Sequence, residues 1–169
     1  MDRQTLQAMQ QPLKDAYRSD AEKALVTLHA QGGLEGDGVT CSVETGRALV
    51  EAGLHPATGG DGTLACSGDL LLQALVACAG VTLRAVATSL EIPIRGGHVF
   101  AEGDLDFRGT LAVSKEAPVG FREIRLRFEV DTDASEEQLA SLLKLTERYC
   151  VVYQTLQNSP ALATSLDAS

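Results

Sequence analysis

The sequence predicts one α+β domain, and three patterns along the chain carry that prediction. Residues 23–54 alternate in strand fashion between glycine turns, residues 70–90 form an apolar run of helical length, and residues 99–130 alternate again as a hairpin would. Strands and helices segregated along the chain in this way are typical of α+β architecture. A length of 169 residues, with 44% hydrophobic and 22% charged residues, suits one globular domain with a real core.

The charge balance argues against two classes of partner. Lys and Arg total 14 against 23 Asp and Glu, which gives a net charge of -9, and the chain has no Trp. Such an acidic chain repels phosphate backbones and anionic lipid, so we expect no nucleic-acid partner and no membrane binding. Gln73 and Arg84 interrupt the longest apolar run, and the polar start of the chain predicts no signal peptide. We therefore expect a cytoplasmic protein.

The N-terminal segment, residues 1–22, is expected to be a helical appendage to the domain proper at residues 23–157. Its apolar residues recur at roughly helical spacing: Leu6, Met9, Leu13, Ala16 and Tyr17. Pro12 interrupts that run, so the pattern predicts two short helical pieces.

Residues 23–54 are predicted to fold as an antiparallel meander. Apolar and polar residues alternate over 24–30 and again over 39–43, and a third strand is expected over 47–54. Short glycine-containing segments supply the turns between these strands.

A glycine-rich loop over residues 55–68 leads into a long helix predicted at residues 70–90. The Ser67-Gly68-Asp69 segment offers capping groups for its first turn, and Pro93 marks its end. The helix is apolar almost all the way round, so it must be buried on most sides. One meander and one hairpin cannot cover it, whereas a second copy of the chain can. We therefore expect an obligate homodimer with this helix at its centre.

The hairpin is predicted from two alternating segments, residues 99–111 and 124–130, on either side of a turn at residues 118–120. One face of each segment is apolar and the other is charged. Arg125 and Arg127 belong to the charged face, so we expect them to line the solvent side of the sheet.

The C-terminal part returns to helical period over residues 135–148. Ser135 and Gln138 have the form of a capping box at the start of this helix. A short helical turn is expected after Cys150, and residues 158–169 are expected to be a weakly structured tail.

The cysteines are the residues best suited to chemistry: Cys41, Cys66, Cys78 and Cys150. Their spacing contains no CxxC or CxH pair, so the sequence predicts no metal site, and the chain is too long to need a disulfide framework. Cys150 stands at a helix boundary, where backbone dipoles can lower a thiol pKa. Cys78 lies midway along the apolar helix. Either can instead be an inert core thiol, as Cys41 in its strand is expected to be, and Cys66 has no supporting context.

Three segments of the chain match a known pattern. They are Asp69-Leu-Leu-Leu-Gln-Ala-Leu-Val-Ala-Cys78-Ala-Gly-Val-Thr-Leu, the hairpin Gly103-Asp-Leu-Asp-Phe-Arg-Gly-Thr with Val119-Gly-Phe-Arg-Glu-Ile-Arg-Leu, and Glu147-Arg-Tyr-Cys150-Val-Val-Tyr-Gln-Thr-Leu156. Over about residues 60–157 they resemble the OsmC/Ohr family of osmotically inducible and organic-hydroperoxide-resistance proteins. The resemblance implies an α+β fold that forms an intertwined homodimer.

The resemblance also implies a thiol-dependent peroxidase acting on organic hydroperoxides. Cys78 would be the peroxidatic thiolate that becomes a sulfenic acid, and Cys150 the resolving thiol that condenses with it to a disulfide. An external dithiol would reduce that disulfide, and no bound cofactor is expected.

The chain departs from the family pattern around the first cysteine. Characterised peroxidases carry a glutamate ten residues before that cysteine, where this chain has Gly68, and Asp69 is the nearest substitute. The family also uses an arginine from the N-terminal half, for which Arg47 and Arg18 are the candidates. The missing glutamate leaves a second hypothesis open, a non-catalytic module of the same fold that binds a small hydrophobic ligand at the dimer interface.

Overall fold

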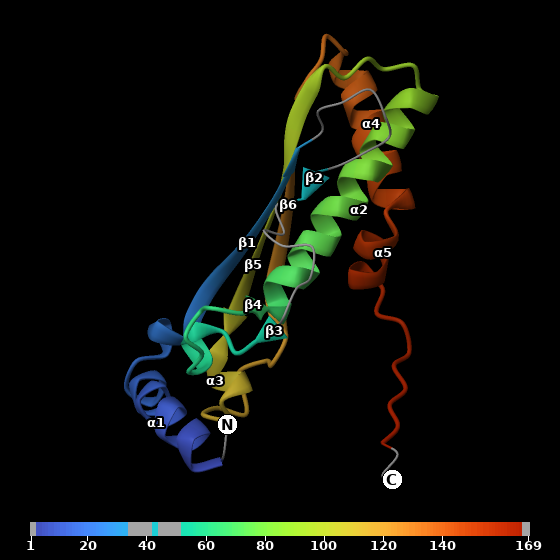
Figure 1. Ribbon diagram of the computed structural model, residues 1–169. Helices are drawn as coiled ribbons and strands as arrows, with labels where there is room; N and C mark the ends of the chain where they lie inside the picture. Colours follow the sequence, from blue (N-terminus) through green and yellow to red (C-terminus); the bar gives the residue numbers. More distant parts are fainter. Residues whose placement is uncertain (1–2, 34–41, 44–51, 167–169) are drawn as a thin grey trace.

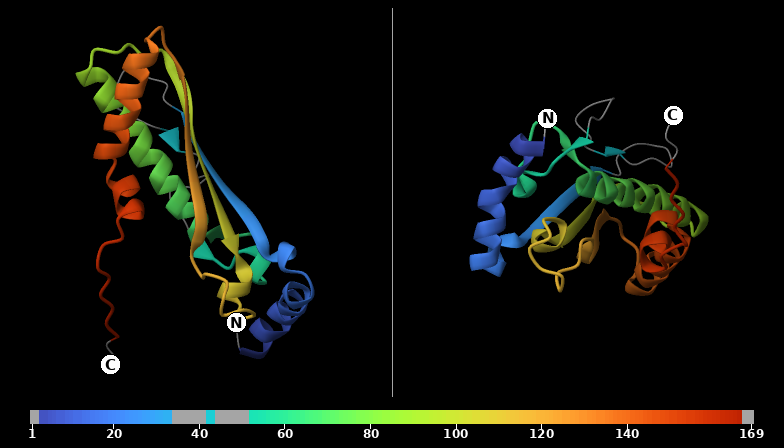
Figure 2. Two further views of the ribbon diagram at one scale, coloured as in Figure 1. Left: turned by 180° about the vertical axis from the view of Figure 1, so that it is seen from behind. Right: turned by 90° about the horizontal axis from the view of Figure 1, so that it is seen from below.

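The computed structural model describes residues 3–33, 42–43 and 52–166. Its framework is a four-stranded antiparallel sheet that helices cover on one face, which is an α+β fold (Figure 1). The strands run in the order β2-β1-β5-β6, with bounds Ser42–Val43, Leu25–Gly33, Gly96–Asp106 and Phe121–Asp131. The covering helices are α2 (Ser67–Ser89), α4 (Glu136–Tyr149) and α5 (Val151–Gln157). Views from behind and from below show these helices on the same side of the sheet (Figure 2).

The β5–β6 hairpin confirms the predicted alternation. Val99 lies opposite Phe128, and the register shifts once, between Asp104 and Leu105. Val99 and Ala101 are fully buried beneath the helices, whereas Arg125 lies on the outer face.

The first hairpin strand is shorter than the sequence predicts. Residues 107–111 do not continue the strand, because Phe107–Thr110 forms the short helix α3. The Asp106 carboxylate accepts the N–H of Arg108 and pairs with its guanidinium, which caps this helix. The cap therefore overrides an alternating pattern that suits a strand equally well.

The predicted meander is confirmed where its first two strands are described, because strand β1 pairs antiparallel with β2 and, on its other side, with β5. Most of the predicted third strand, residues 47–51, lies outside the described residues. Its end, β3 (Ala52–Gly53), pairs in parallel with β4 (Ala65–Cys66) in a separate sheet. Strand β1 also begins at Leu25 rather than earlier, because Ala21–Ala24 forms the 3-10 helix η1 behind an Asp20 cap.

Helix α2 is the core element, as predicted, but it begins earlier than expected. Its N-cap is Cys66 rather than the Ser67-Gly68-Asp69 segment, and the Cys66 side chain makes no capping hydrogen bond. Leu72, Leu75 and Val76 are among its buried residues and pack on the sheet. By length and composition alone the helix could cross a membrane, a test that core helices of soluble proteins also pass.

Helix α2 keeps apolar side chains at the surface of the single chain, although its opposite side forms the core. The large apolar residues concerned, each 37–40% exposed, are Leu71, Val81 and, at the C-cap, Leu90. The homodimer that was expected to cover them stays a prediction.

Helix α1 (Arg3–Ser19) is continuous through Pro12, so the predicted break into two pieces is wrong. A proline inside a helix removes one backbone hydrogen bond, but packing can hold the helix together. Leu13 and Ala16 pack against the core, and the Tyr17 hydroxyl donates to the Ala57 carbonyl at 2.7 Å. Helix α1 therefore lies at the end of the sheet beside α3 (Figures 1 and 2).

The capping box predicted before α4 is present. The Ser135 hydroxyl accepts the Gln138 N–H, and the Gln138 side chain accepts the Ser135 N–H at 2.9 Å. One residue, Cys150, separates α4 from α5. Beyond α5, residues 158–166 form no helix or strand and are exposed.

Candidate active site

Two cysteines 72 positions apart in the sequence meet between α2 and the junction of α4 with α5. Cys78 is half-buried on α2, and Cys150 is 1% exposed at the junction. The two thiols lie close enough for each to influence the pKa of the other, and both cysteines are free rather than joined. The chain therefore brings two free thiols together between α2 and the α4–α5 junction.

The backbone at Cys150 forms an elbow between two helices. The Cys150 N–H still donates to the Thr146 carbonyl at 2.9 Å and so ends α4, while its own carbonyl accepts the Gln154 N–H at 2.9 Å and begins α5. The residue itself is extended, with φ -74° and ψ 108°. The Gln154 side chain also donates to the Glu147 carbonyl at 2.9 Å, which ties α5 back to α4. These bonds fix the direction of the Cys150 side chain toward α2.

The Cys78 sulfur sits among hydrogen-bond donors. Burial alone would raise the pKa of the Cys78 thiol, but the donors outweigh burial and lower that pKa below its usual value. In decreasing order of effect, the donors are the N–H of Val152, the thiol of Cys150, the hydroxyl of Thr82 and the N–H of Val151. Cys78 is thereby favoured as the thiolate of the pair.

Cys150 behaves in the opposite way. Burial, with a smaller contribution from the neighbouring Cys78 sulfur, raises the pKa of the Cys150 thiol to about 11, although the N–H groups of Tyr153 and Val152 act to lower it. The N–H groups at the start of α5 thus act to lower the Cys150 pKa, but burial outweighs them. The N–H groups of Val151 and Val152 also lower the pKa of Cys78, where the donors outweigh burial.

Of the other candidate residues, Asp69 and Arg18 fall in the described part of the chain, and neither lies at this pair within one chain. Asp69 lies in the first turn of α2, about 13 Å along the axis from Cys78 and half a turn around it at ordinary helix geometry. Arg18 is exposed on α1, where it pairs with Asp15 at 2.8 Å. Arg47 and Cys41 lie outside the described residues. The roles proposed for Asp69, Arg18 and Arg47 therefore stay predictions.

Thr82 and the first turn of α5 are the contributors that the sequence interpretation missed. Thr82 stands four residues after Cys78, a spacing that puts both side chains on one face of a helix. That spacing is a signal visible in the sequence. The contact of Val151 and Val152 with Cys78 has no such signal, since it joins two distant elements.

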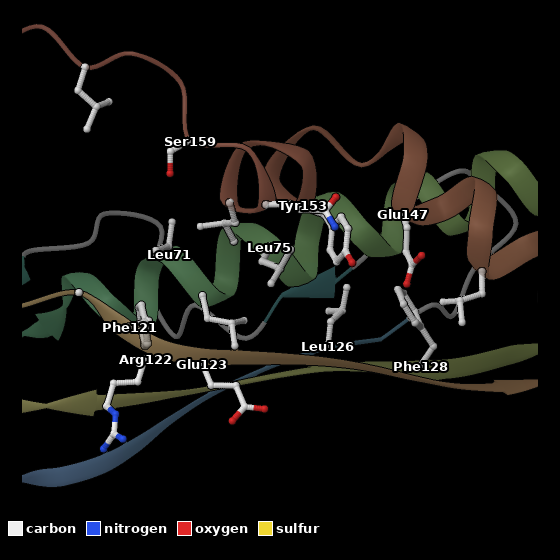
Figure 3. A pocket seen from close by; sticks show the side chains of 16 residues that line it. Leu71, Leu75, Phe121, Arg122, Glu123, Leu126, Phe128, Glu147, Tyr153 and Ser159 are labelled. Atoms are coloured by element: carbon white, nitrogen blue, oxygen red, sulfur yellow. The ribbon is translucent and has the colours of Figure 1, made fainter. Parts of the chain in front are cut away.

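An open groove of about 900 Å³ lies between the helices and β6 (Figure 3). Leu75, one turn before Cys78 on α2, and Tyr153, just after Cys150 on α5, both contribute to its walls. Tyr153 and Glu147 reach toward β6, where Leu126 and Phe128 line the opposite side, and Arg122 points away from the helices. The groove is thus mainly apolar, and although neither cysteine lines it, residues three positions from each of them do.

Metal binding finds no support in the described part of the chain. No group of three or more His, Cys, Asp or Glu residues lies close enough there to hold an ion. Cys66, the remaining described cysteine, is half-buried at the start of α2 and has neither of the other two thiols among its recorded interactions.

Comparison with known proteins identifies related sequences and folds. The family model described as OsmC-like protein matches residues 60–165. A crystal structure of an OsmC-like hydroperoxide resistance protein from Jannaschia sp. is 16% identical, with a TM-score of 0.60 over 86% of this chain and 95% of that one. The crystal structure of an OsmC-like protein from Mycoplasma pneumoniae is 18% identical, with a TM-score of 0.56 over 80% of this chain and 86% of that one. No curated protein matches the chain in sequence.

Proposed function

The chain belongs to the OsmC-like protein family, and from that premise we propose that it is a thiol-dependent peroxidase that reduces organic hydroperoxides with two cysteines. One observation carries the proposal. Two free thiols lie side by side at the core, and their surroundings move the two pKa values in opposite directions, which makes Cys78 the more acidic of the two. A nucleophile beside a protonated partner is what a two-cysteine reduction requires.

The proposed reaction has three steps. The Cys78 thiolate attacks the terminal, hydrogen-bearing oxygen of the hydroperoxide, which forms an S–O bond and breaks the O–O bond, and the alkoxide leaves as the alcohol after it takes a proton. Cys150 then attacks the Cys78 sulfenic acid, which forms the disulfide and releases water. An external dithiol reduces the disulfide and leaves as its own disulfide, so the two electrons that reduced the hydroperoxide come from that dithiol.

The groove supports the choice of an organic rather than a purely inorganic peroxide. Its walls are mainly apolar, and they include Leu75 and Tyr153, each three residues from one of the two cysteines. An alkyl group placed there would leave water while its peroxide group reached the sulfurs. We further propose a cytoplasmic homodimer, because a second copy would cover the apolar residues that α2 leaves exposed.

The test is the formation of one disulfide. Reduced protein is treated with about one equivalent of cumene hydroperoxide or tert-butyl hydroperoxide, blocked with an alkylating agent, and digested for peptide mass spectrometry. We expect a Cys78–Cys150 linkage that a dithiol such as dithiothreitol or dihydrolipoamide reverses. The proposal fails if both thiols remain free, or if Cys41 and Cys66 oxidise in their place.

The groove also favours a second candidate, a non-catalytic module that binds a small hydrophobic ligand. Its volume of about 900 Å³ is within the range of small-molecule sites. Native mass spectrometry of gently purified protein would then show a bound apolar molecule, and the protein would not consume hydroperoxide. Peroxide turnover without a copurified ligand contradicts this candidate.

A further inference from the structure

Glu147 places a carboxylate in a groove whose walls are otherwise mainly apolar. It is half-buried on α4, three residues before Cys150. Its side chain extends across the groove of about 900 Å³ toward β6, where Leu126 and Phe128 line the opposite side (Figure 3). Tyr153 on α5 points into the same space (Figure 3). Two polar side chains from neighbouring helices therefore reach into a groove that is suited to an apolar molecule.

The elbow between α4 and α5 holds these two polar side chains on the same groove. The Gln154 side chain donates to the Glu147 carbonyl at 2.9 Å, so the backbone that carries the carboxylate is tied to α5 next to Tyr153. Within the described residues, neither the Glu147 carboxylate nor the Tyr153 hydroxyl makes a hydrogen bond or ion pair. Half-buried polar groups are usually paired in folded proteins, so both are available to a bound molecule.

The negative charge of Glu147 is not balanced inside the groove. Arg122 and Glu123 also line it from β6, but both side chains point away from the helices, and Glu123 pairs with Arg125 at 3.5 Å (Figure 3). No other Lys or Arg lines the groove in the described part of the chain. Apolar walls screen charge less than bulk water does, so a second anion in the groove would be repelled. A hydroxyl or an N–H group, by contrast, can donate to the carboxylate.

We propose that Glu147 determines the specificity of the groove, which takes molecules with an apolar body, an uncharged hydrogen-bond donor and no negative charge. Alcohols, arylamines and hydroperoxides have this chemistry, whereas carboxylates and sulfonates do not. The identification of the bound molecule as a hydroperoxide rests on the peroxidase function proposed above. The preference against anions does not, because it is measured on the reduced protein without peroxide.

The experiment compares two fluorescent probes that share an anilinonaphthalene skeleton and its N–H donor. Phenylnaphthylamine is neutral, and anilinonaphthalene sulfonate carries one negative charge. Both probes fluoresce more strongly in apolar surroundings, so a titration gives a dissociation constant for each. The ratio of the two dissociation constants isolates the effect of charge, because a change in the apolar walls alters both constants alike.

Three variants of the full chain are compared with the unsubstituted protein. Glu147→Gln removes the charge and keeps the shape of the side chain. Glu137→Gln removes the same charge from an exposed position on the same helix that does not line the groove. Leu143→Asp adds a carboxylate one turn before Glu147, at a groove position that is 45% exposed. Circular dichroism verifies that each variant is folded, and sedimentation gives its oligomeric state.

We expect the unsubstituted protein to bind the neutral probe more tightly than the sulfonate. Glu147→Gln should narrow the ratio of the two dissociation constants about fivefold, mainly through tighter binding of the sulfonate. Leu143→Asp should widen the ratio, and Glu137→Gln should leave it unchanged. An unchanged ratio in Glu147→Gln overturns the inference, as does an equal change in Glu137→Gln or a failure of the unsubstituted protein to bind either probe.

A second copy of the chain seated on the groove would also overturn the inference. It would appear as an altered oligomeric state in Glu147→Gln with no change in the ratio. If Glu147→Gln does not fold, the ratio in Leu143→Asp decides by the same criterion. A protein that shows the preference but forms no Cys78–Cys150 disulfide with hydroperoxide would contradict the peroxidase function and leave the role of Glu147 intact.

Discussion

The outer face of the sheet and the cysteine cluster use opposite kinds of interaction. On the outer face, Arg125 pairs with Asp104 at 2.6 Å and with Glu102 at 3.5 Å, and Arg127 lies 4.1 Å from the centre of the Phe100 ring. These arginines are 38% and 59% exposed. Around Cys78, by contrast, the recorded donors are two backbone N–H groups, a hydroxyl and a thiol.

The difference shows in which region of this protein electrostatic interactions influence its chemistry. Exposed ion pairs are screened by water and salt, so each adds little to stability. A sulfur in the core feels neutral donors strongly, because little water competes with them. Substitutions at the sulfurs should therefore change chemistry, whereas substitutions on the charged face should change almost nothing.

The largest expected effect is loss of turnover in Cys78→Ser. A hydroxyl at that position has no accessible anion near neutral pH, so peroxide consumption coupled to a dithiol should fall to the background rate. Cys150→Ser should still allow the first oxidation and leave a Cys78 sulfenic acid that dimedone traps, but no disulfide should form. Cys66→Ser is the matched control. Turnover by Cys150→Ser at the unsubstituted rate would remove Cys150 from the mechanism.

The alkylation rates of the two thiols should also depend differently on pH. As the pH rises through the lowered pKa of Cys78, its thiolate fraction and hence its alkylation rate should rise and level off, while Cys150 remains a thiol until the pH approaches about 11. Near pH 8 we expect Cys78 to be alkylated about tenfold or more faster than Cys150, as read by peptide mass spectrometry at early times. Equal rates, or the reverse order, would mean that the donors of α5 do not favour Cys78.

The free energy of unfolding should fall when a core side chain on the cysteine-bearing helix α2 is truncated. Leu72 on α2 is fully buried, so Leu72→Ala should lower the free energy of unfolding by about 2–5 kcal/mol. Leu162→Ala is the control, because Leu162 is 88% exposed in the tail and should cost less than about 0.5 kcal/mol. Urea unfolding followed by circular dichroism measures both. A small effect at Leu72 would show that α2 is not the core element of the folded chain.

The smallest effect is expected on the charged face. Arg125→Gln removes exposed ion pairs and should cost about 0.2–1 kcal/mol, with the cost shrinking as salt is added. The alkylation profile of Cys78 should not change. A shift of that profile in Arg125→Gln would contradict the contrast between the two regions, because it would mean that a surface charge influences the pKa of Cys78.

The sequence was informative where a repeating pattern decides the structure. The alternation of Val99, Ala101 and Leu105 predicted the inner face of β5, and the Ser135 capping box predicted the start of α4. It failed where a local contact competes with the pattern. The Asp106 cap turns an alternating segment into α3, and packing of Tyr17 at the sheet end keeps α1 whole across Pro12.

The identity of the two site cysteines could be predicted from the sequence, whereas the direction in which each pKa shifts could not. The two cysteine segments resemble a family pattern, and the structure brings Cys78 and Cys150 together. Which sulfur the first turn of α5 faces depends on the geometry of the elbow at Cys150, and no periodicity reports it. The resemblance implied Cys78 as the thiolate, whereas no residue pattern indicated that burial raises the pKa of Cys150.

The elbow at Cys150 has a mechanical consequence. The helices on either side of it are held to each other by backbone bonds and by Gln154, but α5 is held to α2 through packing. A covalent link from Cys150 to α2 would close a chain segment of roughly 70 residues, for which chain-entropy arguments give a stabilisation of about 4 kcal/mol. Oxidation would thus turn the C-terminal helix from a docked element into a cross-linked one. The disulfide formed by the reaction would also make the molecule more rigid. The rates of proteolysis and of amide exchange in α5 would therefore report the redox state of the protein.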